Sequence, residues 1–204
     1  MVVAHPDDET LWGGGLVLEH PDWSWFVACL CRASDPDREP KFRRALEQLN
    51  ATGAMADLDD EPEQKPLSSE IVEDAILGLL PDCRFDLVVT HGPRGEYTRH
   101  RRHEEVCRAV VSLWRQGRMA TDALWMFAYE DGGRAHLPRP DTDATRCERL
   151  PASRWKTKYR IITDVYGFTP ETWEAQVTPR SEAFTCFETV EQAQTYVMSR
   201  TIKP

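Results

Sequence analysis

The segment Val2-Val3-Ala4-His5-Pro6-Asp7-Asp8-Glu9 decides how this chain is expected to fold. It predicts a short apolar strand that ends at Ala4, then a loop of ionisable side chains, then a helix from residue 9 to about residue 20. The triplet Gly13-Gly14-Gly15 lowers the helix propensity, and we expect it to serve close backbone packing. A second copy of this order begins with an apolar strand over residues 85–90. A polar loop follows it, and a helix then runs to about residue 116.

Between and beyond these segments, apolar strands alternate with amphipathic helices. Strands are predicted over residues 23–31 and 123–129, and helices over residues 41–52, 70–80 and 153–166. The helix over residues 70–80 is expected to begin after a serine cap and to turn Ile71, Ala75 and Leu79 inward. Residues 57–66 and 132–150 read as loops, and residues 170–204 as one short strand and a final helix over residues 191–200.

This alternation predicts an α/β fold, a doubly wound and mostly parallel sheet with helices on both faces. No repeat or domain boundary is visible, so we expect a single domain over residues 1–204. In such sheets ligands bind beyond the carboxyl ends of the strands. The ionisable clusters at residues 5–9 and 91–103 directly follow two strands, and we therefore expect both at one edge of the sheet.

The formal net charge of −9 argues against nucleic-acid binding, which needs a basic surface, and against an anionic membrane as partner. No apolar run approaches the roughly 20 residues of a membrane span, and no secretory signal is visible. We therefore expect a cytoplasmic protein, acting alone or as a homo-oligomer. The six cysteines form no Cys-x-x-Cys pair, and we expect mainly buried, reduced thiols.

The spacing of the ionisable residues is compatible with a zinc site. His5 and Asp8 are three residues apart, and so are His100 and His103, so each pair can share one face of a turn. Two histidines and one aspartate would hold zinc and leave one position open for water, and Asp7 could take the proton of that water. Two plainer interpretations remain open: Asp7-Asp8 could cap the helix, and His-x-x-His could be a solvated pair.

Both motifs together resemble a known family. Ala4-His5-Pro6-Asp7-Asp8-Glu9, with Gly13-Gly14 beyond it, resembles the signature of the PIG-L/LmbE family of zinc N-deacetylases. Thr90-His91-Gly92-Pro93-Arg94-Gly95-Glu96-Tyr97, continuing through His100 and His103, is similar to its second motif. The resemblance covers about residues 1–110. It implies a Rossmann-like deacetylase fold and one catalytic Zn²⁺.

Carried over position by position, the resemblance implies that the zinc ligands are His5, Asp8 and His103. Asp7 would be the general base, and His100 would act as general acid or polarise the developing oxyanion. The implied reaction is hydrolysis of an N-acyl amide, most simply N-acetyl, on a small-molecule amino sugar or its conjugate. Two alternatives stay open: a zinc amidase with a non-sugar substrate, and a non-catalytic domain that has kept the fold.

The resemblance and the basic residues also suggest substrate contacts. Arg44, in Arg44-Ala45-Leu46-Glu47, resembles a family Arg-x-x-Glu that helps hold substrate, although a surface ion pair would explain it equally well. His91 and Arg99 are further candidates. Where the family often has glycine and aspartate, this chain has Arg99 and Arg102, which with Arg94 and Arg101 form a basic stretch. That stretch is either a solvated helix end or a site for a phosphate or carboxylate of the substrate.

Overall fold

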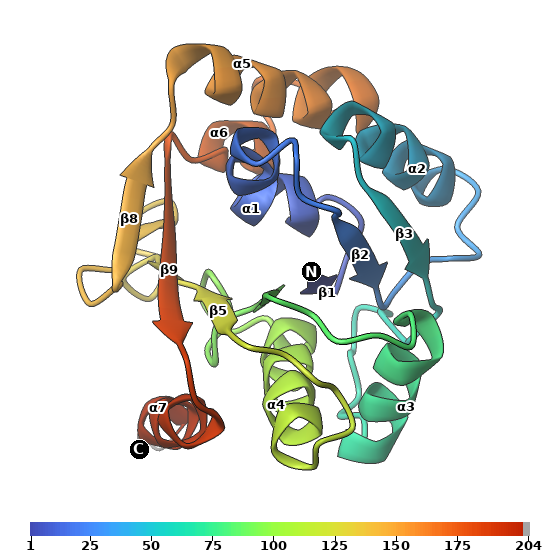
Figure 1. Cartoon of the computed structure of the whole chain (residues 1–204). Helices are drawn as coiled ribbons and strands as arrows, with labels where there is room; N and C mark the ends of the chain where they lie inside the picture. Colours follow the sequence, from blue (N-terminus) through green and yellow to red (C-terminus); the bar gives the residue numbers. More distant parts are fainter. Residues whose placement is uncertain (202–204) are drawn as a thin grey trace.

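A seven-stranded sheet forms the centre of the computed structural model, which describes residues 1–201 (Figure 1). The strand order is β3-β2-β1-β4-β5-β9-β8. The strands are β1 (Val2–Val3), β2 (Phe26–Cys29), β3 (Thr52–Met55), β4 (Val88–Thr90), β5 (Leu124–Phe127), β8 (Arg146–Arg149) and β9 (Ser181–Phe187). The first five in the spatial order are mutually parallel, whereas β9 is antiparallel to both β5 and β8. The predicted doubly wound, mostly parallel α/β fold is confirmed.

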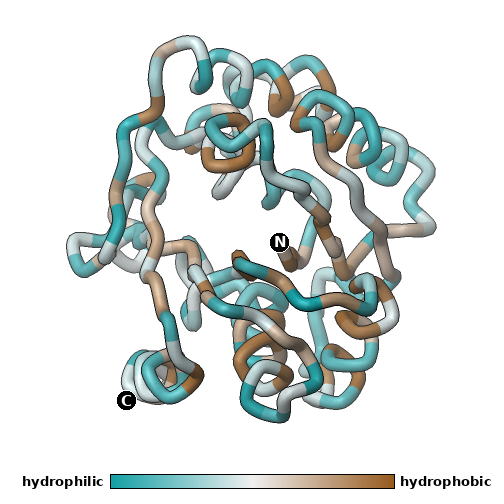
Figure 2. The backbone as a smooth tube through the Cα atoms, in the orientation of Figure 1, coloured by the Kyte–Doolittle hydropathy of each residue, from teal (hydrophilic) through white to brown (hydrophobic). Residues whose placement is uncertain are grey.

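Helices cover both faces of this sheet (Figure 1). One layer contains α1 (Asp8–Glu19), α2 (Arg38–Leu49), α5 (Ala152–Arg160), the π-helical turn η1 (Ile161–Val165) and α6 (Trp173–Val177). The other contains α3 (Ser69–Leu79), α4 (Arg101–Arg115) and α7 (Val190–Thr201). Each layer has its own apolar core against the sheet, and Figure 2 shows hydrophobic stretches along the strands and on the helices. No helix within residues 1–201 is long and apolar enough to cross a membrane.

The order of the strands fixes the position of the site. From β1 the chain moves outward through β2 to β3, and it then returns to β4 on the other side of β1. The crossover connections after β1 and β4 therefore leave in opposite directions, and this opens a crevice at the carboxyl ends of these two strands. The two ionisable clusters of the sequence follow β1 and β4.

The three glycines of α1 allow close packing, as expected from the sequence. A Cβ on Gly15 would lie 2.4 Å from a methyl group of Leu150 and 2.8 Å from Glu182 Oε1, so no side chain fits there. Glu182, on β9, accepts hydrogen bonds from the backbone N–H groups of Gly15 and Leu16, each at 2.7 Å. It also pairs with the buried Lys158 of α5 at 2.5 Å. Helix α1 is thus fastened to the C-terminal half of the chain.

Several local expectations were wrong. Strands β3 and β8 and the short helix α6 lie where loops or a helix end were predicted; both strands are at the edges of the sheet, where an apolar pattern is not required. Ser68 caps α3 as predicted, but the inward residues are Val72 and Ile76, whereas Ile71 is 51% exposed. Three of the cysteines are buried, but Cys83 and Cys147 are exposed. A two-stranded ribbon, β6 (Tyr129–Glu130) with β7 (Arg139–Pro140), completes the fold.

Candidate metal centre and active site

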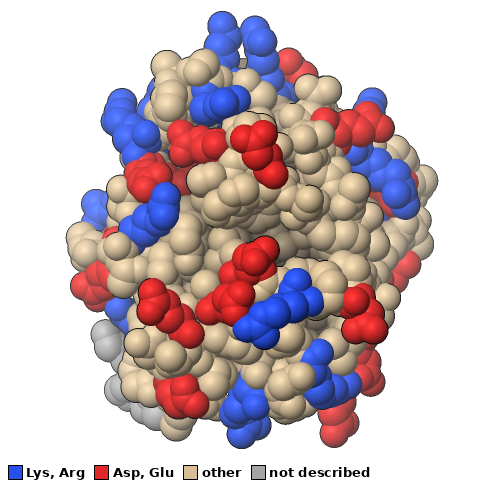
Figure 3. All heavy atoms as spheres, in the orientation of Figure 1, with Lys and Arg blue, Asp and Glu red and all other residues tan. Residues whose placement is uncertain are grey.

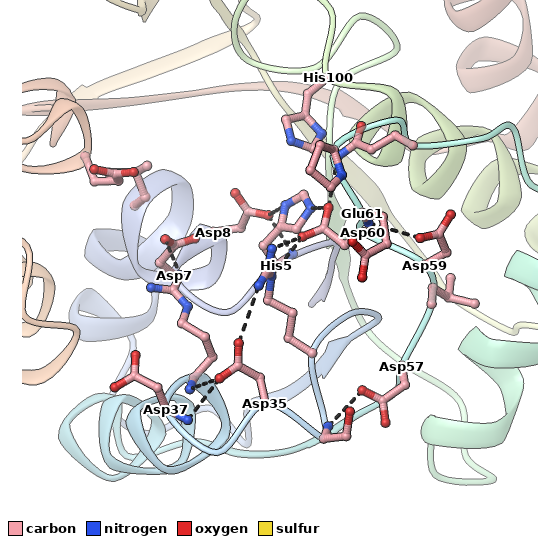
Figure 4. A pocket seen from close by; sticks show the side chains of 18 of the residues that line it. His5, Asp7, Asp8, Asp35, Asp37, Asp57, Asp59, Asp60, Glu61 and His100 are labelled. Atoms are coloured by element: carbon pink, nitrogen blue, oxygen red, sulfur yellow. Dashed lines mark hydrogen bonds and ion pairs between the residues drawn. The ribbon is translucent and has the colours of Figure 1, made fainter.

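Three proposed zinc ligands meet at the carboxyl ends of β1 and β4, and Figure 4 shows two of them, His5 and Asp8, from the side of the cavity. His5 Nδ1 lies 3.2 Å from Asp8 Oδ2 and 3.1 Å from His103 Nε2, and Asp8 Oδ2 lies 3.3 Å from His103 Nε2. In a tetrahedral site with Zn–N and Zn–O bonds of about 2 Å, neighbouring ligand atoms are about 3.3 Å apart. This triangle of donor atoms has the chemistry and the spacing that one zinc ion requires.

Glu96 holds His103 in the orientation that ligation needs. Its Oε2 lies 2.5 Å from His103 Nδ1, so the N–H at Nδ1 donates to the carboxylate and leaves the lone pair of Nε2 for a metal. The same oxygen lies 2.9 Å from His91 Nδ1. Burial raises the pKa of Glu96, but the two imidazoles outweigh it and lower that pKa to about 2. Glu96 belongs to the second motif, but nothing in the residue pattern distinguished it as the partner of His103.

His91 supports the centre from behind and does not reach the cavity. It is fully buried and stacks on His103, with ring centroids 3.8 Å apart. Its Nε2 lies 3.4 Å from Asp8 Oδ2 but accepts a hydrogen bond from the backbone N–H of Ala4 at 2.9 Å, so its lone pair is already used. The candidate role as a substrate contact does not fit this position, because other residues separate the ring from any ligand.

Asp60 orients His5 from the opposite side. Its Oδ1 lies 3.0 Å from His5 Nε2, which directs Nδ1 of that ring toward Asp8 and His103. Arg32 in turn pairs with Asp60 at 2.7 Å. Trp12 positions Asp8, the third proposed ligand, because its indole N–H donates to Asp8 Oδ1 at 3.0 Å. The sequence analysis missed Asp60, which belongs to an acidic stretch that reads as a loop and resembles its neighbours.

Removing this support should weaken metal binding. In Asp60→Ala the His5 ring loses the acceptor that fixes it, and we expect the dissociation constant for zinc to rise by roughly 10- to 100-fold, the usual effect of losing such a partner. Competition with a chromophoric chelator measures it. Asp57→Ala, in the same loop but without a contact to His5, is the matched control and should bind zinc like the wild type. Equal affinity in both variants would remove the positioning role from Asp60.

Asp7 has the environment of a proton acceptor. Its Oδ2 accepts a hydrogen bond from Arg38 Nη2 at 2.8 Å. Burial raises the pKa of Asp7 to about 7, although Arg38 acts against this shift. A carboxylate with a pKa near neutrality is well matched to general-base work. Its backbone φ of 126° is unusual for a residue other than glycine, and strain of this kind is concentrated at functional sites.

The alternative role of Asp7 as a helix cap is wrong. Within the described chain its carboxylate takes no hydrogen bond from the N–H groups of α1. Instead the backbone carbonyl of Asp7 accepts from the N–H groups of Thr10 and Leu11. The backbone N–H of Asp7 itself donates to Glu9 Oε2 at 3.0 Å.

His100 lies beside the triangle at the start of α4. Its ring centroid is 4.3 Å from that of His103 and 4.5 Å from that of His5. Its Nδ1 is buried and has no hydrogen-bond partner within residues 1–201. Burial, helped by the neighbouring imidazoles, lowers the pKa of His100 to about 3, so the ring is neutral in the free protein. Of its two predicted roles, hydrogen bonding to a developing oxyanion fits this neutral state better than proton donation.

Of the predicted substrate contacts, Arg44 lies away from the ligand triangle. It is exposed on α2 and does not line the cavity beside His5 and Asp8, whereas Arg38, on the same helix, reaches Asp7. Arg102 is 1% exposed and binds Glu105 and the backbone carbonyls of Asp59 and Lys65, so it is not part of a surface patch. Arg99 is exposed and pairs with Glu104. The residue spacing could not show that Arg102 would be covered by the loop before α3.

A cavity of about 1040 Å³ opens beside the triangle. His5, Asp7, Asp8 and His100 lie on its wall, with Tyr97 and Trp173, whose rings are 4.7 Å apart. The loops that follow β2 and β3 form much of the remaining wall, and Leu11, Arg38, Phe168 and Glu174 complete it. A small molecule can therefore reach His5, Asp8, the carboxylate of Asp7 and the ring of His100 from one space, whereas His103 is fully buried.

A parallel α/β sheet with two imidazoles and a carboxylate converging at its switch point defines a candidate metal-dependent enzyme. The model of the family described as "PIG-L: GlcNAc-PI de-N-acetylase" matches residues 1–114. This match covers more than half of the chain, and the protein belongs to that family, one of metal-dependent N-deacetylases.

Individual relatives are distant. The chain is 22% identical over 129 residues to the uncharacterized protein L374 of Acanthamoeba polyphaga mimivirus. The match covers 55% of this chain and 56% of that protein, so this chain spans about half the length of its relative. It is similar in fold to N,N'-diacetylchitobiose deacetylase from Pyrococcus horikoshii, with a TM-score of 0.65, 14% identity, and 92% and 82% of the two chains covered. GalB, the 4-carboxy-2-hydroxymuconate hydratase of Pseudomonas putida KT2440, gives a TM-score of 0.61 at 15% identity, with 91% and 94% covered.

Proposed function

We propose that this protein hydrolyses the N-acetyl amide of an amino sugar or an amino-sugar conjugate, with one zinc ion held by His5, Asp8 and His103. The observation that carries the proposal is the triangle of donor atoms, 3.1–3.3 Å on each side, of which His5 and Asp8 line a cavity together with Asp7. Membership in a family of N-deacetylases and the fold shared with a chitobiose deacetylase support the choice of an acetamide.

Three residues of the cavity, Asp7, His100 and Arg38, have a role in this reaction. A bound zinc ion supplies Lewis acidity, which polarises the amide carbonyl and makes water more acidic. Asp7 accepts the proton of the attacking water, and its carboxyl group then holds the proton that the departing amine needs. His100 donates a hydrogen bond to the oxygen that becomes negative. Arg38, bound to Asp7 Oδ2, fixes the direction of that carboxylate.

Hydration of a carbon–carbon double bond is the second candidate function, because GalB, a hydratase, shares the fold at a similar TM-score. Addition of water to a carbon–carbon double bond would use the same Asp7 as base but would release neither acetate nor an amine. An N-acyl substrate without a sugar would still release its acid and its amine.

The test combines metal analysis with acetate release. Purified protein should contain one zinc per chain and release acetate from N-acetylglucosamine derivatives. His5→Ala, Asp8→Ala and His103→Ala should each lose most of the zinc and the activity. Full zinc in all three variants would overturn the ligand assignment. Zinc-loaded protein that hydrates an unsaturated carboxylate but releases no acetate from a panel of N-acetyl sugars and amides would overturn the deacetylase function.

A further inference from the structure

The cavity wall is strongly acidic. The residues that line it include nine carboxylates and only two basic side chains, Arg32 and Arg38. Figure 4 shows these carboxylates distributed around His5 and His100, from several different loops. On the outer face drawn in Figure 3, by contrast, acidic and basic side chains are interspersed. The excess of negative charge in the cavity is therefore more than a reflection of the overall net charge.

Some of these carboxylates already have partners inside the protein. Asp8 belongs to the triangle, Asp7 pairs with Arg38, and Asp60 pairs with Arg32 and His5. Asp35 accepts hydrogen bonds from the backbone N–H groups of Asp37 and Arg38, and it also pairs with Arg32 at 3.4 Å. Asp37 pairs with Lys41 at 2.7 Å, and Asp59 pairs with Arg102 at 3.4 Å. A divalent ion at the triangle and these basic side chains thus offset the charge of six of the nine carboxylates.

Three carboxylates of the wall remain uncompensated. Within residues 1–201, Asp57, Glu61 and Glu174 form no ion pair. Asp57 and Glu61 stand on the loop after β3, whereas Glu174 stands on α6 beside Trp173, so they come from separate elements of the wall. Asp57 accepts one backbone hydrogen bond, from the N–H of Ser34. A ligand in the cavity would thus meet negative charge from more than one direction.

The basic residues that could bind an anion are used elsewhere. Arg102 is buried against Glu105 and two backbone carbonyls, and Arg99 pairs with Glu104. Neither lines this cavity, although Arg99 lines an adjoining hollow that shares Tyr97, His100 and Trp173 with it. Inside the cavity itself, a phosphate or carboxylate of the substrate would therefore meet mainly acidic side chains.

We propose that the substrate is cationic: an N-acetylated amino sugar that also carries at least one free, protonated amine, which the acidic wall of the cavity binds while the acetamide is at the triangle. This inference rests on the proposed function and narrows its substrate class. A cavity lined by charge of one sign concentrates ligands of the opposite sign and accelerates their association. Because the charges face solvent, the advantage should decrease as salt screens them.

Matched disaccharides test the proposal. The neutral probe is N,N'-diacetylchitobiose, and the cationic probes are the two disaccharides of the same size that carry one acetamide and one free amine. N-acetylglucosamine 6-phosphate, compared with N-acetylglucosamine, is the anionic probe. We expect kcat/KM for acetate release to be roughly tenfold higher for the better cationic disaccharide than for the neutral one, and the ratio to approach one between about 0.01 M and about 1 M salt.

Variants locate the effect on the wall. In Asp57→Asn combined with Glu61→Gln, the preference for the cationic disaccharide should fall several-fold, so that its kcat/KM moves toward that of the neutral disaccharide. Glu63→Gln is the matched control, because Glu63 is exposed on the same loop but does not line the cavity. An unchanged ratio in the double variant, or an equal or higher rate with the phosphorylated sugar, would overturn the inference.

A binding measurement separates this inference from the proposed function. Calorimetry on the zinc-loaded wild type compares fully deacetylated chitobiose, a dication, with N,N'-diacetylchitobiose. If the dication binds more tightly than N,N'-diacetylchitobiose and no acetate is released, the deacetylase function is overturned and the acidic wall is supported as an amine site. Acetate release without preferential binding of the dication would support the function and overturn the inference. Absence of both binding and release would overturn both.

Discussion

Asp7→Asn should lower kcat by roughly two to four orders of magnitude while zinc content and melting temperature stay close to those of the wild type. Asparagine keeps the shape of the side chain and can still accept the hydrogen bond from Arg38, but it cannot take a proton from water. Because the carboxylate caps no N–H group of α1 in the described chain, its replacement has no capping contribution to lose. Zinc, melting temperature and turnover should be measured on the same preparation.

The control for this variant is Glu47→Gln, an exposed carboxylate on α2 that does not line the cavity. It should leave turnover unchanged. If Asp7→Asn retains near-normal turnover with full zinc, another group accepts the proton and the mechanism loses its base. If it loses zinc instead, Asp7 contributes to metal binding and the drop in rate says nothing about proton transfer.

The largest expected effect on stability comes from Lys158. Its side chain is fully buried, and Lys158→Met would leave Glu182, which is 2% exposed, without its cation. Removing one partner of a buried ion pair typically costs about 3–5 kcal/mol, because the remaining charge is uncompensated. We expect a loss of this size in the free energy of unfolding, measured by urea denaturation followed by tryptophan fluorescence.

Two further variants distinguish the loss of charge from the loss of packing at Lys158. Lys156→Met, an exposed lysine on the same helix, should change the free energy of unfolding by no more than about 0.5 kcal/mol. Lys158→Met combined with Glu182→Gln should recover much of the loss, since no charge is then buried alone and glutamine can still accept a hydrogen bond from α1. A double variant no more stable than Lys158→Met would mean that packing, rather than charge, determines the effect.

The convergence of His5, Asp8 and His103 was predictable because their segments directly follow two strands of the predicted parallel sheet. His5 and Asp8 follow one strand, His103 lies in the segment after another, and parallel strands bring their carboxyl ends to the same edge. The alternation of apolar strands and amphipathic helices was sufficient for the central sheet. The same reasoning failed at β3 and β8, because an edge strand has only one neighbour and needs little apolar character.

The residues around the triangle could not be predicted in this way. Asp60 reaches His5 from a loop 55 positions further along the chain, and nothing in its neighbourhood distinguishes it from Asp59 or Asp57. Arg38 and Arg44 lie on one helix, and only the packing of that helix determines which of them faces Asp7. Charge counted along the sequence also suggested a basic stretch at residues 94–102, whereas folding buries Arg102 and leaves an acidic cavity.

The attachment of α1 to the C-terminal half has a consequence for cooperativity. The helix that carries Asp8 is held by Glu182 of β9, and the hydroxyl of Tyr166, which follows η1, donates to Glu9 Oε1 at 2.8 Å. Residues 1–114, which contain all three proposed ligands, therefore take part of the support of α1 from the C-terminal half of the chain. Local opening of β9 would release α1 and disperse the ligands, so amide hydrogens in the two elements should exchange with solvent through one shared opening event.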